Sequence, residues 1–381
     1  MHDPHLNASV LDAEEILAGI LEWVEIETPT SDPAGVNRLV DVVERLFTQT
    51  GARVQRTPGQ DGFGDILTAR SPWGGEQPGI LVLAHLDTVH PLGSKAERNP
   101  IRREGDRVFG PGIYDMKAGG YLVYHAFRHL LRGGRSGALP ITFLYVPDEE
   151  VGSPTSRAAI EAEGRNARYV LVAEPAREGG KVVTGRNGVM RYDVLVNGRP
   201  AHAGVRHMDG RSAIKEMARQ VLRFEDLTDY ARGLTCSVGV IQGGTVVNVV
   251  PAECRAEIDI RVPDAATSVE VQAQIAAFRA FDQDCTVTIT GDLNRPPYEK
   301  SAGVAALFAH ARGLAAETGF DLQDLKTGGG SDGNFTAALG VPTLDGLGAD
   351  GDGAHTYAEF IYLSSLVERT RLMARLFETL A

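Results

Sequence analysis

The chain has 381 residues, of which 43% are hydrophobic and 23% are charged, an ordinary composition for a globular protein. This length is long for a single hydrophobic core, so we expect two domains. The formal net charge of −12 argues against nucleic acid and against an anionic membrane as partners. No apolar run approaches membrane-spanning length, and residues 1–5 lack the basic start of a secretory signal.

The three cysteines, Cys236, Cys254 and Cys285, lie far apart in the sequence and show no spacing typical of zinc ligands. Isolated thiols suit a reducing compartment, and we expect these three to be small buried apolar side chains. We therefore predict a cytoplasmic protein.

The first elements predicted along the chain are two amphipathic helices. Apolar residues recur at helical spacing over residues 16–24 and again over residues 36–47. Pro33 near the start and Gly51 after the end are typical bounds for the second helix. Strands and helices then alternate: strand 80–84, helix 117–131, strand 141–146, helix 155–163 and strand 169–173. This alternation predicts an α/β fold with a largely parallel sheet between helices.

The pattern changes after residue 187. The next predicted elements are strand 189–196, helix 213–224, strands 237–242 and 254–262, helix 269–281 and strand 286–290. A helix over 304–318 and a strand near 341–344 then resume the first pattern. We therefore predict one α/β domain in two parts, residues 1–187 and 299–381, interrupted by an inserted α+β domain, residues 188–298.

Acidic and imidazole side chains gather just after the predicted strands. An apolar strand ends on His85 and is followed by Asp87, and later strands lead to the Asp148-Glu149-Glu150 stretch and to Glu174. The carboxyl ends of parallel strands are where open α/β sheets place their sites. Each stretch alone is compatible with a structural role. Their joint occurrence, together with Asp115 and His355 near glycine-rich segments, indicates a functional site.

These side chains form a set of metal ligands. Nitrogen and oxygen donors without thiolates suit Zn²⁺ first, with Mn²⁺ or Co²⁺ as alternatives. Five ligands are too many for one catalytic ion but match two ions if one carboxylate bridges them. The charges agree, because three carboxylates and a bridging hydroxide balance two divalent cations. The predicted ligands are His85, Asp115, Glu150, Glu174 and His355.

Two carboxylates remain for other roles. Glu149 is left over beside the ligand Glu150, and a free carboxylate next to a metal-bridging water is a natural general base. Asp87, two residues after His85, is placed to accept the second imidazole N–H and to hold that ring.

The motifs resemble the co-catalytic zinc exopeptidase and amidohydrolase family that includes glutamate carboxypeptidase, succinyl-diaminopimelate desuccinylase, acetylornithine deacetylase and aminoacylase. The resemblance covers nearly the whole chain and is nearest to the glutamate carboxypeptidase-like members. It is carried by residues 85–89 (HLDTV), 112–119 (GIYDMKAG), 148–153 (DEEVGS), 173–175 (AEP), 329–334 (GGSDGN) and 353–356 (GAHT).

The resemblance implies roles for the ligands and a fold. Asp115 would bridge the two ions, His85 and Glu174 would complete one site, and Glu150 and His355 the other. The family fold is a zinc-aminopeptidase-like catalytic domain with an inserted lid or dimerisation domain, so a homodimer through that domain is expected. In the inserted domain, His202 matches a histidine that stabilises the oxyanion, in many relatives from the partner subunit.

Three residues are candidates for binding a substrate carboxylate. Arg261 and Arg295 each offer the guanidinium fork that pairs with carboxylates, and Asn248 also matches a family substrate position. For Arg261, an ion pair with Asp259 is the competing interpretation.

The expected substrate is a small carboxylate-bearing amide or peptide. We expect attack of a metal-bridging water, assisted by Glu149, to release a C-terminal glutamate or aspartate from an N-acyl or peptidyl conjugate. A deacylase or amidohydrolase of another small acid or aromatic amide is the alternative. A non-catalytic binding protein on the same fold is the third possibility, and the intact Glu149 argues against it because binding needs no free base.

Overall fold

The computed structural model describes residues 11–381, so the prediction for residues 1–5 lies outside the described part. The chain divides into two compact units. The first unit contains the chain up to Gly185 together with Glu299–Lys326 and Ser331–Ala381, and the second contains Arg186–Tyr298 and Thr327–Gly330. Within residues 11–381, no helix has the length and apolarity needed to cross a bilayer.

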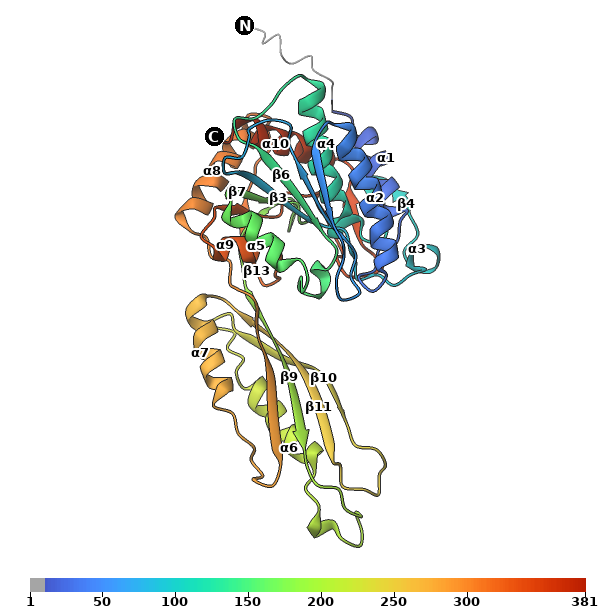
Figure 1. The fold of residues 1–381 in the computed structure, drawn as a ribbon, viewed down its shortest axis with the longest axis vertical. Helices are drawn as coiled ribbons and strands as arrows, with labels where there is room; N and C mark the ends of the chain where they lie inside the picture. Colours follow the sequence, from blue (N-terminus) through green and yellow to red (C-terminus); the bar gives the residue numbers. More distant parts are fainter. Residues whose placement is uncertain (1–10) are drawn as a thin grey trace. The chain divides into compact units, whose positions relative to one another are not determined.

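The first unit is built on a six-stranded sheet with the order β1-β2-β6-β3-β7-β14. Figure 1 labels β6, β3 and β7 of this sheet. The last four strands of that order run parallel, and β1 and β2 add an antiparallel edge. All seven residues of β3 are buried, as expected for a strand covered on both faces. The strands are β1 (Arg53–Thr57), β2 (Ile66–Arg70), β3 (Gly79–His85), β6 (Ile141–Val146), β7 (Ala167–Val172) and β14 (Thr343–Leu344).

Helices cover both faces of this sheet. The larger core joins one face to α1 (Ala13–Val24), α2 (Pro33–Gln49), α4 (Ala118–Arg132), α8 (Ala302–Ala316) and α10 (Ser365–Thr379). A smaller core joins the other face to α5 (Arg157–Arg165) and α9 (Gly333–Ala338). The predicted α/β fold, a mostly parallel sheet between two helical layers, is confirmed.

A small antiparallel sheet brings two distant segments of the first unit together. Its order is β15-β16-β5-β4, and Phe109 of β5 pairs with Phe360 of β16. The segment that leads to Asp115 therefore lies beside the segment that follows His355. These short elements, none of them predicted from the sequence, are α3 (Ser94–Glu97), β4 (Arg102–Glu104), β5 (Arg107–Phe109), β15 (Gly351–Asp352) and β16 (Phe360–Tyr362). A further pair joins β8 (Val182–Arg186) to β13 (Asp324–Thr327).

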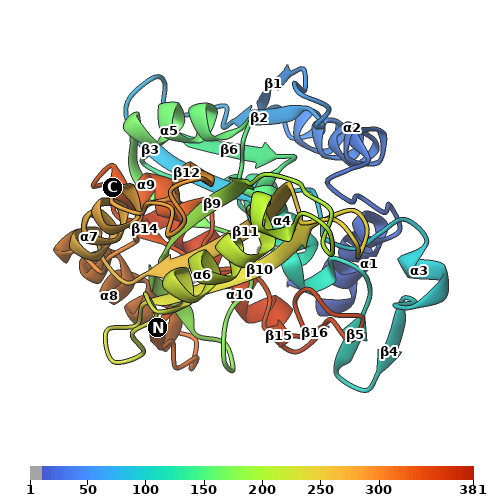
Figure 2. The same cartoon turned by 90° about the horizontal axis from the view of Figure 1, so that it is seen from below.

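The second unit is an antiparallel four-stranded sheet with the order β10-β11-β9-β12 (Figures 1 and 2). Its strands are β9 (Gly188–Asn197), β10 (Thr235–Gly243), β11 (Glu253–Val262) and β12 (Thr286–Arg295). Buried and more exposed residues alternate along β11, which is typical of a sheet with one covered face. Helices α6 (Ala213–Glu225) and α7 (Ala265–Ala276) pack on that face, and the three free cysteines belong to the shared core.

Two elements of the second unit, α7 and β12, differ from the predicted ranges by more than two residues at an end. Helix α7 begins four residues earlier than predicted because Asp264 caps it: the Asp264 side chain accepts a hydrogen bond from the Thr267 amide at 2.7 Å. Strand β12 extends to Arg295, so this arginine ends a strand and does not lie in a loop. Pairing with β9 keeps the last residues of β12 extended.

Candidate metal centre

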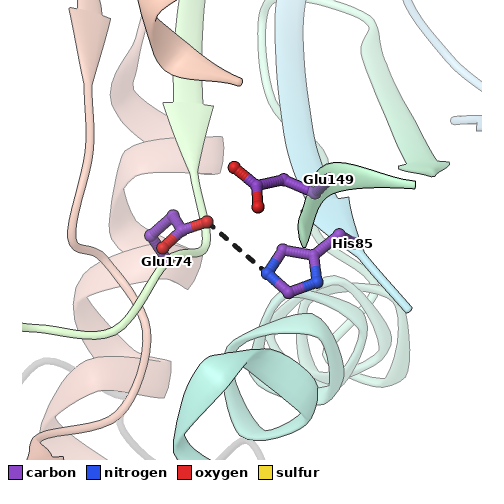
Figure 3. Close-up of side chains that lie close together, drawn as sticks. All are labelled: His85, Glu149 and Glu174. Atoms are coloured by element: carbon purple, nitrogen blue, oxygen red, sulfur yellow. Dashed lines mark ion pairs between the residues drawn. The ribbon is translucent and has the colours of Figure 1, made fainter. Parts of the chain in front are cut away.

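The five predicted ligands and Glu149 all lie in the first unit and come together in space. His85 is the last residue of β3, the 3₁₀ turn Glu149–Val151 follows β6, and Glu174 follows β7. These parallel strands are neighbours in the sheet, so their carboxyl ends meet. Figure 3 shows His85, Glu149 and Glu174 facing one another at this edge.

Asp115 lies between the two histidines. Its Oδ1 is 3.2 Å from His85 Nε2, and its Oδ2 is 3.4 Å from His355 Nε2. His85 Nε2 is also 3.6 Å from Glu174 Oε1, and His355 Nε2 is 3.2 Å from Glu150 Oε2. The five predicted ligands therefore form two adjoining clusters that share the Asp115 carboxylate.

These separations fit two divalent cations. Ligand atoms that bind a tetrahedral ion at about 2.0–2.1 Å lie about 3.3 Å apart, which matches the spacing in both clusters. Glu150 Oε1 is buried and has no hydrogen-bond partner, so this oxygen still lacks the positive group that a carboxylate needs in the interior. The nitrogen and oxygen donors suit Zn²⁺, Mn²⁺ or Co²⁺.

The ionisable groups of the two clusters shift one another's pKa values. Burial raises the pKa of Glu150 to about 8, although the His355 imidazole works against this shift. Burial would also raise the pKa of Asp115, but hydrogen bonds from His355 and His85 hold it well below its usual range. Contacts with Asp115 and Glu150 raise the pKa of His355 to about 10. Shared protons thus provide the positive charge that the carboxylates require.

His355 reaches the centre from an unusual backbone conformation. Its φ of 63° lies in the left-handed region, where residues other than glycine are uncommon. The His355 side chain is 56% exposed, whereas those of Asp115 and Glu150 are 10% and 5% exposed. The centre is therefore open to solvent on the side of His355.

Glu149 lies beside the first cluster. Ligand atoms of His85, Glu149 and Glu174 lie within 4.8 Å of one another, and Figure 3 shows the Glu149 carboxylate directed toward the other two side chains. Glu150, the next residue of the 3₁₀ turn, instead lies within the same distance of His85 and Asp115. This position is within reach of an ion or of a water molecule next to it.

Asp87 holds two parts of the centre. Its carboxylate is buried and accepts hydrogen bonds from the Glu149 and Glu150 amides, each at 3.2 Å, and from the Thr30 hydroxyl at 2.7 Å. The His85 Nδ1 atom lies 2.9 Å from the main-chain oxygen of Asp87 and 3.4 Å from its carboxylate. The nearer acceptor for the imidazole is therefore the Asp87 carbonyl, and either contact leaves Nε2 directed at Asp115.

Sequence reasoning missed several residues that support the centre. Glu359 is fully buried and binds the loop that carries Asp115, and His90 contacts Glu359. Ser153 donates a hydrogen bond to Asp332, which ties the segment after Glu150 to the glycine-rich segment near residue 330. None of these contacts leaves a periodic signal in the sequence. The position of Glu359, four residues after His355, was the only available hint.

The four other candidate residues lie in the second unit. His202 is exposed, and its Nδ1 accepts hydrogen bonds from the Gly204 and Val205 amides at 3.2 Å. Asn248 is exposed, and its main-chain oxygen accepts a hydrogen bond from the Ala203 amide, so the segments of His202 and Asn248 adjoin.

The two arginines occupy equivalent positions on the second unit's sheet. Arg261 of β11 and Arg295 of β12 both pair with Val189 of β9, so they share one face of the sheet. Arg261 forms two hydrogen bonds with Asp259, at 2.5 and 3.0 Å, which is the ion pair that the sequence left open. Arg295 is 4% exposed.

The chain matches known protein families. The model of a family described as Peptidase family M20/M25/M40 matches residues 81–379, a range that includes His85 and His355. The chain is 32% identical over 371 residues to Carboxypeptidase G2 from Pseudomonas sp. (strain RS-16), which covers 95% of this chain and 88% of that protein.

Solved structures share the fold. A tripeptidase from Staphylococcus aureus superposes with a TM-score of 0.78 at 20% identity, covering 97% of this chain and 99% of that chain. The aminopeptidase PepT from Bacillus cereus superposes with a TM-score of 0.75 at 22% identity, covering 96% of this chain and 98% of that chain. At these identities the likeness extends to the fold alone.

We expect the protein to bind two divalent cations and to release protons as they bind. The ions replace the protons shared among the ligands, so the affinity for Zn²⁺ should rise as the pH rises toward the pKa values of Glu150 and His355, about 8 and about 10. Calorimetric titration in buffers of different ionisation enthalpy measures the ions bound and the protons released.

His355→Gln should lower the affinity for one of the two ions by at least about tenfold, because the cluster of Asp115 and Glu150 loses its imidazole ligand. His310→Gln is the matched control, since the His310 ring contacts the Thr379 hydroxyl on another part of the first unit. Binding that releases no protons and does not depend on pH would contradict the assignment.

Proposed function

The chain belongs to peptidase family M20/M25/M40, and we propose that it is a two-metal carboxypeptidase that releases a C-terminal glutamate or aspartate from a peptidyl or N-acyl conjugate. The observation that carries this proposal is the placement of Asp115 between His85 and His355, with one carboxylate oxygen toward each imidazole. A side chain that offers an oxygen to each of two ligand clusters is suited to bridge two ions.

Each residue of the centre has a proposed role. His85, Asp115 and Glu174 would hold one ion, and Asp115 would hold the other together with Glu150 and His355. When bound, the ions, Zn²⁺ by preference, polarise the scissile carbonyl and acidify water.

Glu149 accepts the proton of the attacking water and returns it to the leaving nitrogen as the amide bond breaks. Its position beside the cluster of His85 and Glu174 supports this role. Asp87 keeps Glu149 in place through the Glu149 amide and limits the rotation of the His85 ring.

Two observations support the proposed preference for an acidic C-terminal amino acid: candidate binding residues in the second unit, and similarity to a known carboxypeptidase. We assign Arg295, Asn248 and Arg261 to binding of the substrate carboxylate and His202 to stabilising the oxyanion. Similarity to Carboxypeptidase G2 supports cleavage at a carboxyl terminus. Asp259 already binds the Arg261 guanidinium, so Arg261 has less capacity left for a substrate carboxylate.

A deacylase or amidohydrolase of another small acid or aromatic amide is the second candidate. The same metal centre serves that reaction, because the chemistry at the carbonyl is unchanged and only the groups on either side of the amide differ. A non-catalytic binding protein is disfavoured by Glu149, because binding alone does not require a general base beside the first cluster.

We expect the metal-loaded protein to hydrolyse N-acyl glutamates and aspartates faster than the matching C-terminal amides. The measurement is the release of free amino acid from a panel of N-acyl amino acids and dipeptides. Arg295→Ala should raise KM mainly for the substrates with a free carboxylate, by about tenfold or more, because a charged hydrogen-bond pair is lost. An equal effect on neutral amides would remove the carboxylate-binding role, and cleavage of none of the panel would favour the second candidate.

Glu149→Ala should retain both ions and lose turnover by about 100-fold to 10,000-fold, the range expected when a general base is removed. Metal content and kcat are measured on the same preparation. Glu163→Ala is the control, since Glu163 pairs with Arg70 near the amino-terminal ends of the parallel strands. Wild-type turnover in Glu149→Ala would exclude this base, and loss of one ion would make Glu149 a ligand.

We further propose that the protein is cytoplasmic and forms a homodimer through the second unit. Buried free cysteines support a reducing compartment. Strand β10 lies at an edge of its sheet, and Ile241 on it and Leu222 on α6 are 52% and 66% exposed, which supports an interface.

Sedimentation velocity at micromolar concentration should give the mass of a dimer. Leu222→Glu combined with Ile241→Glu should give a monomer, because charged side chains are costly to bury in an interface and like charges repel. A wild-type monomer would refute the dimer.

A further inference from the structure

Glu359 is a buried carboxylate that none of the proposed catalytic roles uses. It lies directly before β16, is 0% exposed, and is four residues from the ligand His355. A charged group in the interior is costly unless it is fully hydrogen-bonded. The partners of Glu359 therefore indicate what its charge is used for.

Glu359 accepts hydrogen bonds from the loop that carries Asp115. Its Oε1 accepts from the Tyr114 amide and from the Asp115 amide, each at 2.8 Å, and its Oε2 accepts from the Gly112 amide at 2.9 Å. Three amides of one four-residue segment thus converge on a single carboxylate. One of these amides is that of Asp115, whose side chain lies between the His85 and His355 imidazoles.

A histidine from a third segment completes the contacts of Glu359. His90 Nε2 lies 2.6 Å from Glu359 Oε2, and His90 is 5% exposed. His90 follows β3 in the same loop as Asp87, five residues after the ligand His85. Glu359 therefore connects three ligand-bearing segments: the loop after β3, the loop of Asp115, and the segment of His355.

We propose that Glu359, oriented by His90, is the positioning residue of the metal centre, and that it sets the place of Asp115 relative to His85 and His355 so that one carboxylate reaches both ions. This inference rests on the two-metal centre proposed above. Within residues 11–381, the hydrogen bonds of Glu359 go to backbone amides and to His90, so it acts on the ligands through the backbone. Hydrogen bonds to an ionised acceptor are stronger than neutral ones, which makes a carboxylate better suited than an amide to fix this loop.

The chain provides a matched control. Glu216 in the second unit is also buried, at 2% exposed, and accepts hydrogen bonds from the Phe281 and Asp282 amides at 2.9 and 3.0 Å and from the Gln220 side chain at 2.8 Å. Glu216→Gln therefore removes the same kind of charge from the same kind of site, but without any metal ligand on the bound segment.

The experiment compares metal binding by the wild type, Glu359→Gln and Glu216→Gln. Each full-length protein is freed of metal and titrated with Co²⁺, and the visible absorption of the ion reports its coordination geometry. We expect Glu359→Gln to lower the affinity of both sites for Co²⁺ by about tenfold to a hundredfold, the loss that is typical when a residue that orients metal ligands is replaced. The Co²⁺ absorption spectrum should also change. Glu216→Gln should bind Co²⁺ as the wild type does.

A second variant covers the case in which Glu359→Gln does not fold. His90→Phe keeps Glu359 and its three amide contacts but removes the His90 donor, and it should weaken Co²⁺ binding several-fold, with His90→Gln recovering part of the loss. Wild-type affinity and an unchanged spectrum in folded Glu359→Gln, or in both His90 variants, would overturn the positioning role. A wild-type protein that binds no Co²⁺ would instead refute the two-metal centre, so the two failures are distinct.

Discussion

The structure around the candidate centre depends on keeping several acidic side chains together at one edge of a sheet. Asp115, Glu150 and Glu174 are nearly buried, and Glu149 lies beside them. Carboxylates at such distances repel one another and have lost most of their water, so they require positive charge among them. The His85 and His355 imidazoles provide it through shared protons, and divalent cations would provide more.

The remaining buried carboxylates have a different task. Asp87 and Glu359 accept hydrogen bonds from backbone amides of segments that carry ligands or the proposed base. A hydrogen bond to a charged group contributes about 1.5–3 kcal/mol, so a few such bonds hold a loop that packing alone would leave loose. The carboxylates proposed to bind ions and the carboxylates that bind the backbone are thus different residues, although both groups consist of aspartates and glutamates.

The fold was predictable where its signal is local. The apolar run of β3, the alternation of strands and helices, and the α+β pattern after residue 187 each depend on neighbouring residues, and they led to the correct fold class. The start of α7 was misplaced because one capping side chain, Asp264, outweighs the apolar periodicity at that end. The short strands β5 and β16 were missed because pairing between distant segments, and not composition, makes them strands.

The sequence by itself determined the family, the chemical types of the candidate ligands, and their position after strands, because motifs and apolar runs are properties of short segments. Only the tertiary structure decided which donors lie 3.2 to 3.6 Å apart, that Asp115 faces two imidazoles, and that Arg261 is bound to Asp259. It alone revealed the contact between His90 and Glu359, which are 269 positions apart. Such contacts follow from the packing of distant loops against one sheet edge, and no local pattern in the chain encodes them.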